Sequence, residues 1–311
     1  MRSSNCGQAA AALLLDALVG EPPEAVHPTV LMGRAISAFE RAASRLKDPW
    51  SRRLAGVALA LSLPTLVFFS TRKLLAAAPG KIRWLIGTTL LSTTLSMRGL
   101  SEAAGSVEHA LLGRRLEDAR ARVGHFVGRD TDDLPKAEVC RAAVESVAEN
   151  TSDGVVAPML YGLLFGAPGA LAYKAVNTLD SMVGHPQPPY TELGWASARL
   201  DDLANLLPSR ITAFLVATVS GKPLRTLRSA NCYGSLTRSP NAGMVEAAFA
   251  GALGVRLGGT NTYSGLARKG PILGEGRLPA SDDIRRAVGL MYRCCVLLGT
   301  VASLKEGASR G

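Results

Sequence analysis

The alternation of apolar and charged segments along this chain predicts a protein built almost entirely of helices. Apolar segments occupy residues 8–19, 54–71, 84–97 and 287–304. The eighteen uncharged residues 54–71 are long enough to cross a bilayer, whereas the first segment is too short to span one upright and the third is marginal. Basic pairs flank 54–71 on both sides, so the positive-inside rule gives this segment no orientation. A buried helical hairpin of a soluble protein is the alternative for 54–71 and 84–97.

Charged segments between the apolar ones predict amphipathic helices. In residues 36–46 and 101–128 charges recur while apolar residues keep a stripe at helical spacing, and Gly113 is expected to break the second segment into a helical pair. A further helix is expected over residues 135–149, since a proline and acidic residues stand at its start. Almost no segment shows the two-residue alternation of a half-buried strand. The pattern therefore predicts no sheet.

The composition of this helical protein favours a membrane protein. Hydrophobic residues make up 47% of the chain and charged residues only 19%, a balance typical of membrane proteins or of a large helical interior. The formal net charge of +10 indicates anionic neighbours, such as lipid headgroups or phosphates. Nucleic acid is a poor fit, because the basic residues are scattered and lack an aromatic stacking platform. The apolar residues Gln8–Leu15 run directly into Asp16 without a cleavage pattern, so we expect no cleaved signal peptide.

The expected fold class is all-α: a multi-helix integral membrane bundle with amphipathic extramembrane helices and polar motif loops. We expect one domain over residues 1–311, with an extramembrane helical insert at about 101–150. The five cysteines include no CxxC pair, which favours buried reduced thiols over a disulfide framework or a zinc site.

The candidate chemistry is concentrated between residues 145 and 210. Glu145 and Glu149 are four residues apart and share a helical face, where two like charges disfavour the helix unless a cation lies between them. Three more polar residues continue this first cluster into an expected helix end at Gly154: Asn150, Ser152 and Asp153. Oxygen ligands of this kind suit Mg²⁺, and a solvated helix end is an equally good interpretation.

Two further clusters follow the uncharged residues 154–173. Lys174 and Asn177 share one helical face with Asp180 or Ser181, and the lysine either snorkels or binds a phosphate. In the third cluster, Asp201 and Asn205 share a face and Asp202 lies beside them, which repeats the combination of acid and amide. The uncharged segment itself fits a kinked span, a re-entrant hairpin or a buried helix pair.

Three other polar positions draw attention. His27, held before a proline, is best interpreted as a packed turn residue. Ser239 or Asn241 could cap a helix whose early turn holds Glu246. The glycine-rich segment 258–265 has no such ready structural reason. Known nucleotide-binding and catalytic motifs, such as GxxxxGK, GxGxxG, GxSxG and HExxH, are absent from the sequence, so any ATP site is of an uncommon type.

Six motifs in order along the chain strongly resemble the CobD/CbiB family, the cobinamide-phosphate synthases of cobalamin biosynthesis. The similarity extends from about Leu13 to the last helix. The motifs are LDALVGEPPEAVHP, VGRDT, ESVAENTSDGVVAP, YKAVNTLDSMVGH, GWASARLDDLANLLPSRITA and SPNAGMVEAAFAGALGVRLGG.

The resemblance implies a multi-pass enzyme of the bacterial cytoplasmic membrane. It implies that the enzyme joins the free propionate carboxylate of adenosylcobyric acid to (R)-1-amino-2-propanol or its O-phosphate, consuming ATP and Mg²⁺ without a tightly bound prosthetic group. A carboxylate is a poor electrophile, so it must be activated, most simply as an acyl phosphate, and the amine must then arrive deprotonated. Membrane lipid and other late cobalamin-pathway membrane enzymes are the further expected partners.

On this resemblance we assign roles to the clusters. The expected metal ligands are Glu149, Asp153, Asp201 and Asp202. Expected nucleotide and substrate contacts come from Glu145, Asn150, Asn205, Arg210 and Asn241. The expected catalytic group comprises Lys174 and Asn177, which contact phosphate and orient substrate, Asp180, and His185 as a general base, whose ordinary pKa near 6.5 suits that task.

Some residues depart from the family pattern, and two other functions compete. Glu21 replaces an aspartate, the segment after His185 lacks a basic residue, and Met244 and Val245 replace Trp-Pro. A CDP-alcohol phosphotransferase also combines clustered acids with apolar helices, but here the segment DGVVAP lacks the arginine of its DGxxAR hallmark. A non-catalytic membrane scaffold of corrin-pathway enzymes would have no need of the polar clusters.

Overall fold

The computed structural model describes residues 2–263 and 265–308, and these form two compact units interleaved along the sequence. The first unit comprises residues 2–96, 153–205 and 299–308, and the second comprises 97–152 and 206–298. The chain is mostly helical, as the hydrophobic pattern predicts.

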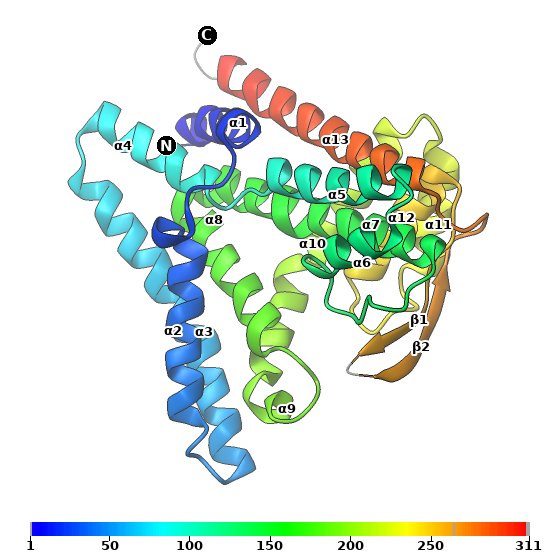
Figure 1. Cartoon of the computed structure of the whole chain (residues 1–311). Helices are drawn as coiled ribbons and strands as arrows, with labels where there is room; N and C mark the ends of the chain where they lie inside the picture. Colours follow the sequence, from blue (N-terminus) through cyan, green and yellow to red (C-terminus); the bar gives the residue numbers. More distant parts are fainter. Residues whose placement is uncertain (1, 264, 309–311) are drawn as a thin grey trace. The chain divides into compact units, whose positions relative to one another are not determined.

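The first unit is formed around three helices that share a core. Its elements are α1 (Arg2–Val19), η1 (Glu24–Val26), α2 (Pro28–Ala43), α3 (Pro49–Ala77), α4 (Gly80–Ser92), the π-helical turn η2 (Ser152–Val156, from Asp153), α8 (Ala157–Val183), α9 (Tyr190–Leu193), the start of α10 (Trp195–Val219) and the end of α13 (Ser281–Ala308). Helices α2 and α3 run side by side (Figure 1) and both pack against α8. Their shared core includes Ile36, Leu63 and Leu179.

The regular helical geometry is interrupted at two places in this part of the chain. Gly154 was expected to end a helix, but the helix instead continues through η2, where the backbone widens into a π turn. Within α8, Gly166 has φ 71° and ψ −167°, a conformation that side-chain-bearing residues rarely adopt, and Pro168 follows. The uncharged segment is therefore a helix broken at Gly166. Single π turns inside helices occur often at functional sites.

The second unit combines helices with a β-hairpin. Its elements are α5 (Met97–Leu112), α6 (Leu116–Gly124), α7 (Lys136–Thr151), the remainder of α10, α11 (Pro223–Tyr233), α12 (Ala242–Leu253), β1 (Leu257–Tyr263), β2 (Leu266–Leu273) and most of α13. The pair α5–α6, separated after Leu112, confirms the predicted break near Gly113. Strand β1 pairs antiparallel with β2 (Figure 1) and lies against α7.

The expectation that the chain contains no sheet is therefore wrong. The register shifts between Gly258 and Thr260, and Gly259 has φ 97°, so a glycine bulge bends β1. Three glycines and a proline in these two strands suppress the usual β-strand pattern of branched and aromatic residues. The hairpin forms because it covers α7 and α12, which is a tertiary contact.

Three helical segments of the described chain are long and apolar enough to cross a membrane: Pro49–Ala77, Lys136–Val183 and Ser281–Leu304. Only 28% of the most apolar window of Pro49–Ala77 is buried, which leaves Leu61, Leu66 and Phe69 more than half exposed. So large an exposed apolar surface on one helix indicates contact with lipid or with another apolar surface.

Candidate functional site

The first unit gathers the second and third polar clusters around Asp201 on α10. The Nδ2 of Asn205 donates to Asp201 Oδ2 at 3.0 Å, and the hydroxyl of Tyr173 donates to Asn205 Oδ1 at 2.8 Å. Asp180, Asn177 and Asp202 also interact with Asp201. The i, i+4 spacing on α10 and the packing of α8 beside it place these groups together. The predicted acids and amides of both clusters are thus brought into one group.

Asp201 is held in surroundings that disfavour its charge. Burial, together with the neighbouring acid Asp180, raises the pKa of Asp201 to about 7, and hydrogen bonds from Asn205 and Asn177 only partly oppose this. Its Oδ1 atom is buried without a hydrogen-bond partner. A carboxylate with an unused buried oxygen and acidic neighbours is suited to a cation, and oxygen donors of this kind fit Mg²⁺.

Lys174 lies between two acids of the same unit. Its electrostatic partners are Glu21, in the loop before α2, and Asp153, in η2. His27 caps α2 by accepting the Thr29 N–H at 3.2 Å, and its Nε2 faces Glu21 at 3.7 Å. The histidine is a packed turn residue, as predicted. Burial lowers its pKa more than Glu21 raises it. His185 is exposed and stacks obliquely near Tyr190, with ring centroids 5.8 Å apart.

The second unit contains a polar pocket of about 360 Å³ between α7, α12 and the hairpin. Glu145 is 4% exposed, and both of its carboxylate oxygens accept hydrogen bonds. Oε2 accepts from Arg129, and Oε1 accepts from Arg141 Nη1 at 2.9 Å and from the Gly258 N–H at 2.6 Å. Glu145 therefore orders two guanidinium groups and the bulge of β1.

Asn261 of the hairpin bridges the two arginines. Asn261 Oδ1 accepts from Arg129 Nη1 at 2.6 Å and from Arg141 Nη2 at 2.8 Å. Arg141 also donates from Nε to Glu138 at 2.7 Å and from Nη2 to the carbonyl of Thr260 at 3.0 Å. Charge-assisted hydrogen bonds with this degree of burial hold the pocket wall rigid.

Two further carboxyl groups line the same pocket, Glu149 and Glu246. Burial, followed by repulsion from Glu145 and Glu149, raises the pKa of Glu246 well above its ordinary value, although Arg129 and Arg141 oppose the shift. Its surroundings therefore favour the protonated form of Glu246. A buried carboxyl group with a raised pKa is suited to donating a proton.

The other predicted residues of this unit form local pairs. Arg210 Nη1 donates to Asn241 Oδ1 at 2.7 Å, which brings two predicted contacts together. Asn241 is the N-cap residue of α12, but its side chain makes no capping hydrogen bond; Ser239 Oγ instead accepts the N–H groups of Asn241 and Ala242 at 3.3 and 3.5 Å. Asn150 Nδ2 donates to the carbonyl of Ser146 at 2.9 Å.

The predicted site residues thus divide between the two units. Asp153, Lys174, Asn177, Asp180, His185, Asp201, Asp202 and Asn205 belong to the first, and Glu145, Glu149, Asn150, Arg210 and Asn241 to the second. Within the described residues, no group of three His, Cys, Asp or Glu side chains is arranged to hold a metal by itself. Mg²⁺ commonly takes only one or two carboxylates, with phosphate and water as its other ligands.

Sequence reasoning did not single out Arg129, Arg141, Glu246 or Asn261 as site residues. A usable signal existed for two of them: Arg141 is four residues before Glu145, and Asn261 lies in the unexplained glycine-rich segment. Arg129 and Glu246 come together with them only through folding.

In Asp201, the raised pKa predicts a specific pH dependence of stability. A carboxyl group whose pKa is raised from 3.8 to about 7 on folding favours the folded state when protonated. In metal-free detergent solution, stability is therefore expected to fall as the pH rises from about 4 to about 7 and to level off above that. The Asp201→Asn variant should lack this pH dependence of stability when thermal unfolding is measured at several pH values. Asp132→Asn, an exposed change, is the control; a slope unaltered by Asp201→Asn would contradict the shift.

The fold and its sites define a mostly helical protein with candidate membrane spans and buried polar pockets. The family profile described as "CobD/Cbib protein" matches residues 9–291. The chain therefore belongs to the CobD/CbiB family.

Several relatives carry the printed name "Cobalamin biosynthesis protein CobD". The protein of Sinorhizobium fredii is 39% identical over 308 residues, with 94% of each chain covered. That of Geobacter metallireducens is 42% identical with the same coverage, and that of Chromobacterium violaceum is 43% identical, covering 91% of this chain and 90% of the relative. No solved structure matches the chain.

Proposed function

We propose that the protein is an ATP-dependent amide ligase of cobalamin biosynthesis. It joins the free propionate carboxylate of adenosylcobyric acid to (R)-1-amino-2-propanol or its O-phosphate. Membership of the CobD/CbiB family over residues 9–291 is the observation that carries this proposal. The raised pKa of Glu246 in the polar pocket and the acid–amide group around Asp201 support it as chemistry-bearing sites.

In this proposal the metal binds at the oxygen donors around Asp201. Asp201, with its unused Oδ1, and its neighbour Asp202 would hold Mg²⁺ together with phosphate oxygens and water. Mg-ATP supplies the phosphoryl group that activates the substrate carboxylate. Lys174, whose partners are acidic, orients anionic groups beside Asp153.

The polar pocket would handle protons in this proposal. Glu246, whose pKa is raised by burial, can donate a proton, and Glu149 can accept one from the ammonium group of the amino alcohol, which leaves a neutral amine to attack. Arg129 and Arg141, fixed by Glu145 and Asn261, keep positive charge at the pocket wall.

The test is a reconstitution of the purified, detergent-solubilised protein. Adenosylcobyric acid, aminopropanol phosphate and Mg-ATP are supplied, and the amide product is measured by mass spectrometry with and without ATP. Product that depends on ATP is the expected result. Absence of product where a relative is active would overturn the ligase and favour the scaffold. Asp201→Asn and Glu149→Gln are expected to lose activity, with exposed Glu102→Gln as control; full activity in both would overturn the residue roles.

We also propose that α3 lies in the bacterial cytoplasmic membrane as one of several spans. Leu66 on α3 and Leu112 on α5 are equally open in the protein itself, with exposed fractions of 64% and 62%. Leu66→Cys and Leu112→Cys are each introduced into the Cys232→Ser protein and tested in native membranes. The Leu66→Cys protein is expected to react with a charged maleimide at least ten times more slowly than the Leu112→Cys protein, because lipid excludes the reagent. Equal rates in membranes would contradict the proposal.

A further inference from the structure

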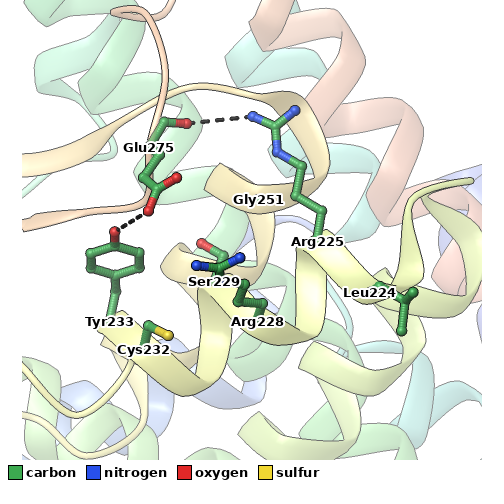
Figure 2. A pocket seen from close by; sticks show the side chains of 8 residues that line it. All are labelled: Leu224, Arg225, Arg228, Ser229, Cys232, Tyr233, Gly251 and Glu275. Atoms are coloured by element: carbon green, nitrogen blue, oxygen red, sulfur yellow. Dashed lines mark hydrogen bonds between the residues drawn. The ribbon is translucent and has the colours of Figure 1, made fainter.

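A second pocket in the second unit, of about 410 Å³, has no part in the proposed ligation. It lies where α11 packs on α12, and Figure 2 shows its lining side chains. The α11 residues in the pocket recur at helical spacing and so share one face: Arg225, Arg228, Ser229, Cys232 and Tyr233. Glu275, from the turn after β2, completes it. None of the predicted site residues lines this pocket.

The two helices approach closely because α12 carries a glycine at their contact. A Cβ added to Gly251 would lie 2.6 Å from the Cβ of Ser229, closer than side chains pack. The absence of a side chain at Gly251 therefore allows α11 and α12 to pack closely. It also leaves its own position in the pocket lining free of a side chain.

The pocket has an excess of positive charge. In the described part of the chain, no ion pair joins Arg225 or Arg228 to a carboxylate. Arg225 Nη2 makes only a long hydrogen bond, 3.4 Å, to the main-chain oxygen of Glu275. The carboxylate of Glu275 accepts the Tyr233 hydroxyl at 2.9 Å (Figure 2). The pocket lining thus holds two guanidinium groups and one carboxylate, which already accepts a hydrogen bond.

A buried hydroxyl in the lining also lacks a partner. Ser229 is 6% exposed, and its Oγ forms no hydrogen bond. Leaving a buried hydroxyl unsatisfied is destabilising, so such a group is usually retained where a ligand or a water completes it. Guanidinium forks together with a hydroxyl donor match the oxygens of a phosphate group.

We propose that this pocket is a binding site for a phosphate-bearing ligand. Arg225 and Arg228 bind the phosphate oxygens, and Ser229 donates its hydroxyl to the same group. The volume exceeds what a phosphate ion alone needs and falls in the range of small-molecule sites, about 300–1,000 Å³. The phosphate belongs either to a soluble molecule or to a lipid headgroup, since Leu224 at the rim is 84% exposed and can enter lipid. The inference does not rest on the proposed ligation.

Cys232 provides a direct readout of occupancy. It lines the pocket and is exposed, whereas the other four cysteines are buried. A neutral thiol reagent such as iodoacetamide should therefore label Cys232 alone in the folded protein, and peptide mass spectrometry confirms both the position and the fold. A ligand beside Arg228 will slow this labelling.

The experiment measures the rate of Cys232 labelling in full-length protein with four probes at equal ionic strength. Inorganic phosphate and AMP are tested in detergent, and phosphatidylglycerol and phosphatidylcholine in nanodiscs. We expect at least tenfold protection from a probe that carries an accessible anionic phosphate. Protection by phosphate or AMP identifies a soluble ligand, and protection by phosphatidylglycerol nanodiscs alone identifies a lipid headgroup.

The double variant Arg225→Gln, Arg228→Gln is expected to lose this protection while still being labelled only at Cys232. Lys136→Gln, which removes an exposed cation of the same unit outside the pocket, should retain it. The proposal is overturned if no probe protects the wild type by tenfold, or if protection persists in the double variant.

Discussion

Replacing Arg141 by alanine is expected to lower the free energy of unfolding by about 3–5 kcal/mol. Arg141 is 2% exposed and pairs with Glu145, which is 4% exposed, while Glu138 and Asn261 bind the same guanidinium. Removing the arginine leaves Glu145 with a buried charge that Arg129 and the Gly258 N–H compensate only in part. Denaturant or thermal unfolding in detergent measures the loss.

The matched control is Arg98→Ala. Arg98 also pairs with a glutamate at i, i+4, Glu102, at 2.7 Å, but both side chains are substantially exposed. Exposed pairs of this kind contribute about 0.2–1 kcal/mol. If both variants lose the same small amount, Arg141 is not part of the rigid wall of the pocket.

Glu246→Gln is expected to reduce the rate of amide formation by about 10²–10⁴-fold, the usual contribution of a positioned acid or base. Glutamine has the shape of the protonated glutamate side chain but has no proton to give at working pH. Because the pKa of Glu246 is raised on folding, ionisation destabilises the native protein as the pH rises, and the glutamine variant escapes that cost. At pH 8 it should be at least as stable as the wild type.

The combination of lost activity and retained stability separates a catalytic role from a structural one. Glu102→Gln, an exposed change in the same unit, should leave both quantities unaltered. Unchanged turnover in Glu246→Gln would show that this carboxyl group plays no part in proton transfer. Turnover and unfolding are measured on the same preparation.

The like charges at Glu145 and Glu149 illustrate how far sequence reasoning carries. Two glutamates on one helical face require a cation, and a cation is present. For Glu145 that cation is a pair of guanidinium groups, Arg129 and Arg141. Arg141 was within reach of a sequence argument, one helical turn before Glu145. Arg129 comes from the loop before α7, and spacing on one helix says nothing about a loop.

The β-hairpin, in contrast, could not be predicted from the local sequence. Residues 257–273 are rich in glycine and have little intrinsic preference for a strand, so no local pattern predicts them as β. Their pairing is decided by packing against α7 and α12 and by the bonds that Asn261 and Gly258 make to Arg141 and Glu145. Tertiary contacts overrode weak local propensity.

The sequence by itself determined the helical class, the break near Gly113 and the grouping of acid and amide on α10, because these depend on periodicities within a few turns of one helix. It also carried the family motifs. Tertiary structure alone decided that the helix continues through η2, and that Glu246 lies buried beside other carboxyl groups, which raises its pKa. It also decided that α11 and α12 enclose a basic pocket around Ser229. Burial and charge proximity depend on which distant segments meet, and side-chain spacing along one segment does not contain that information.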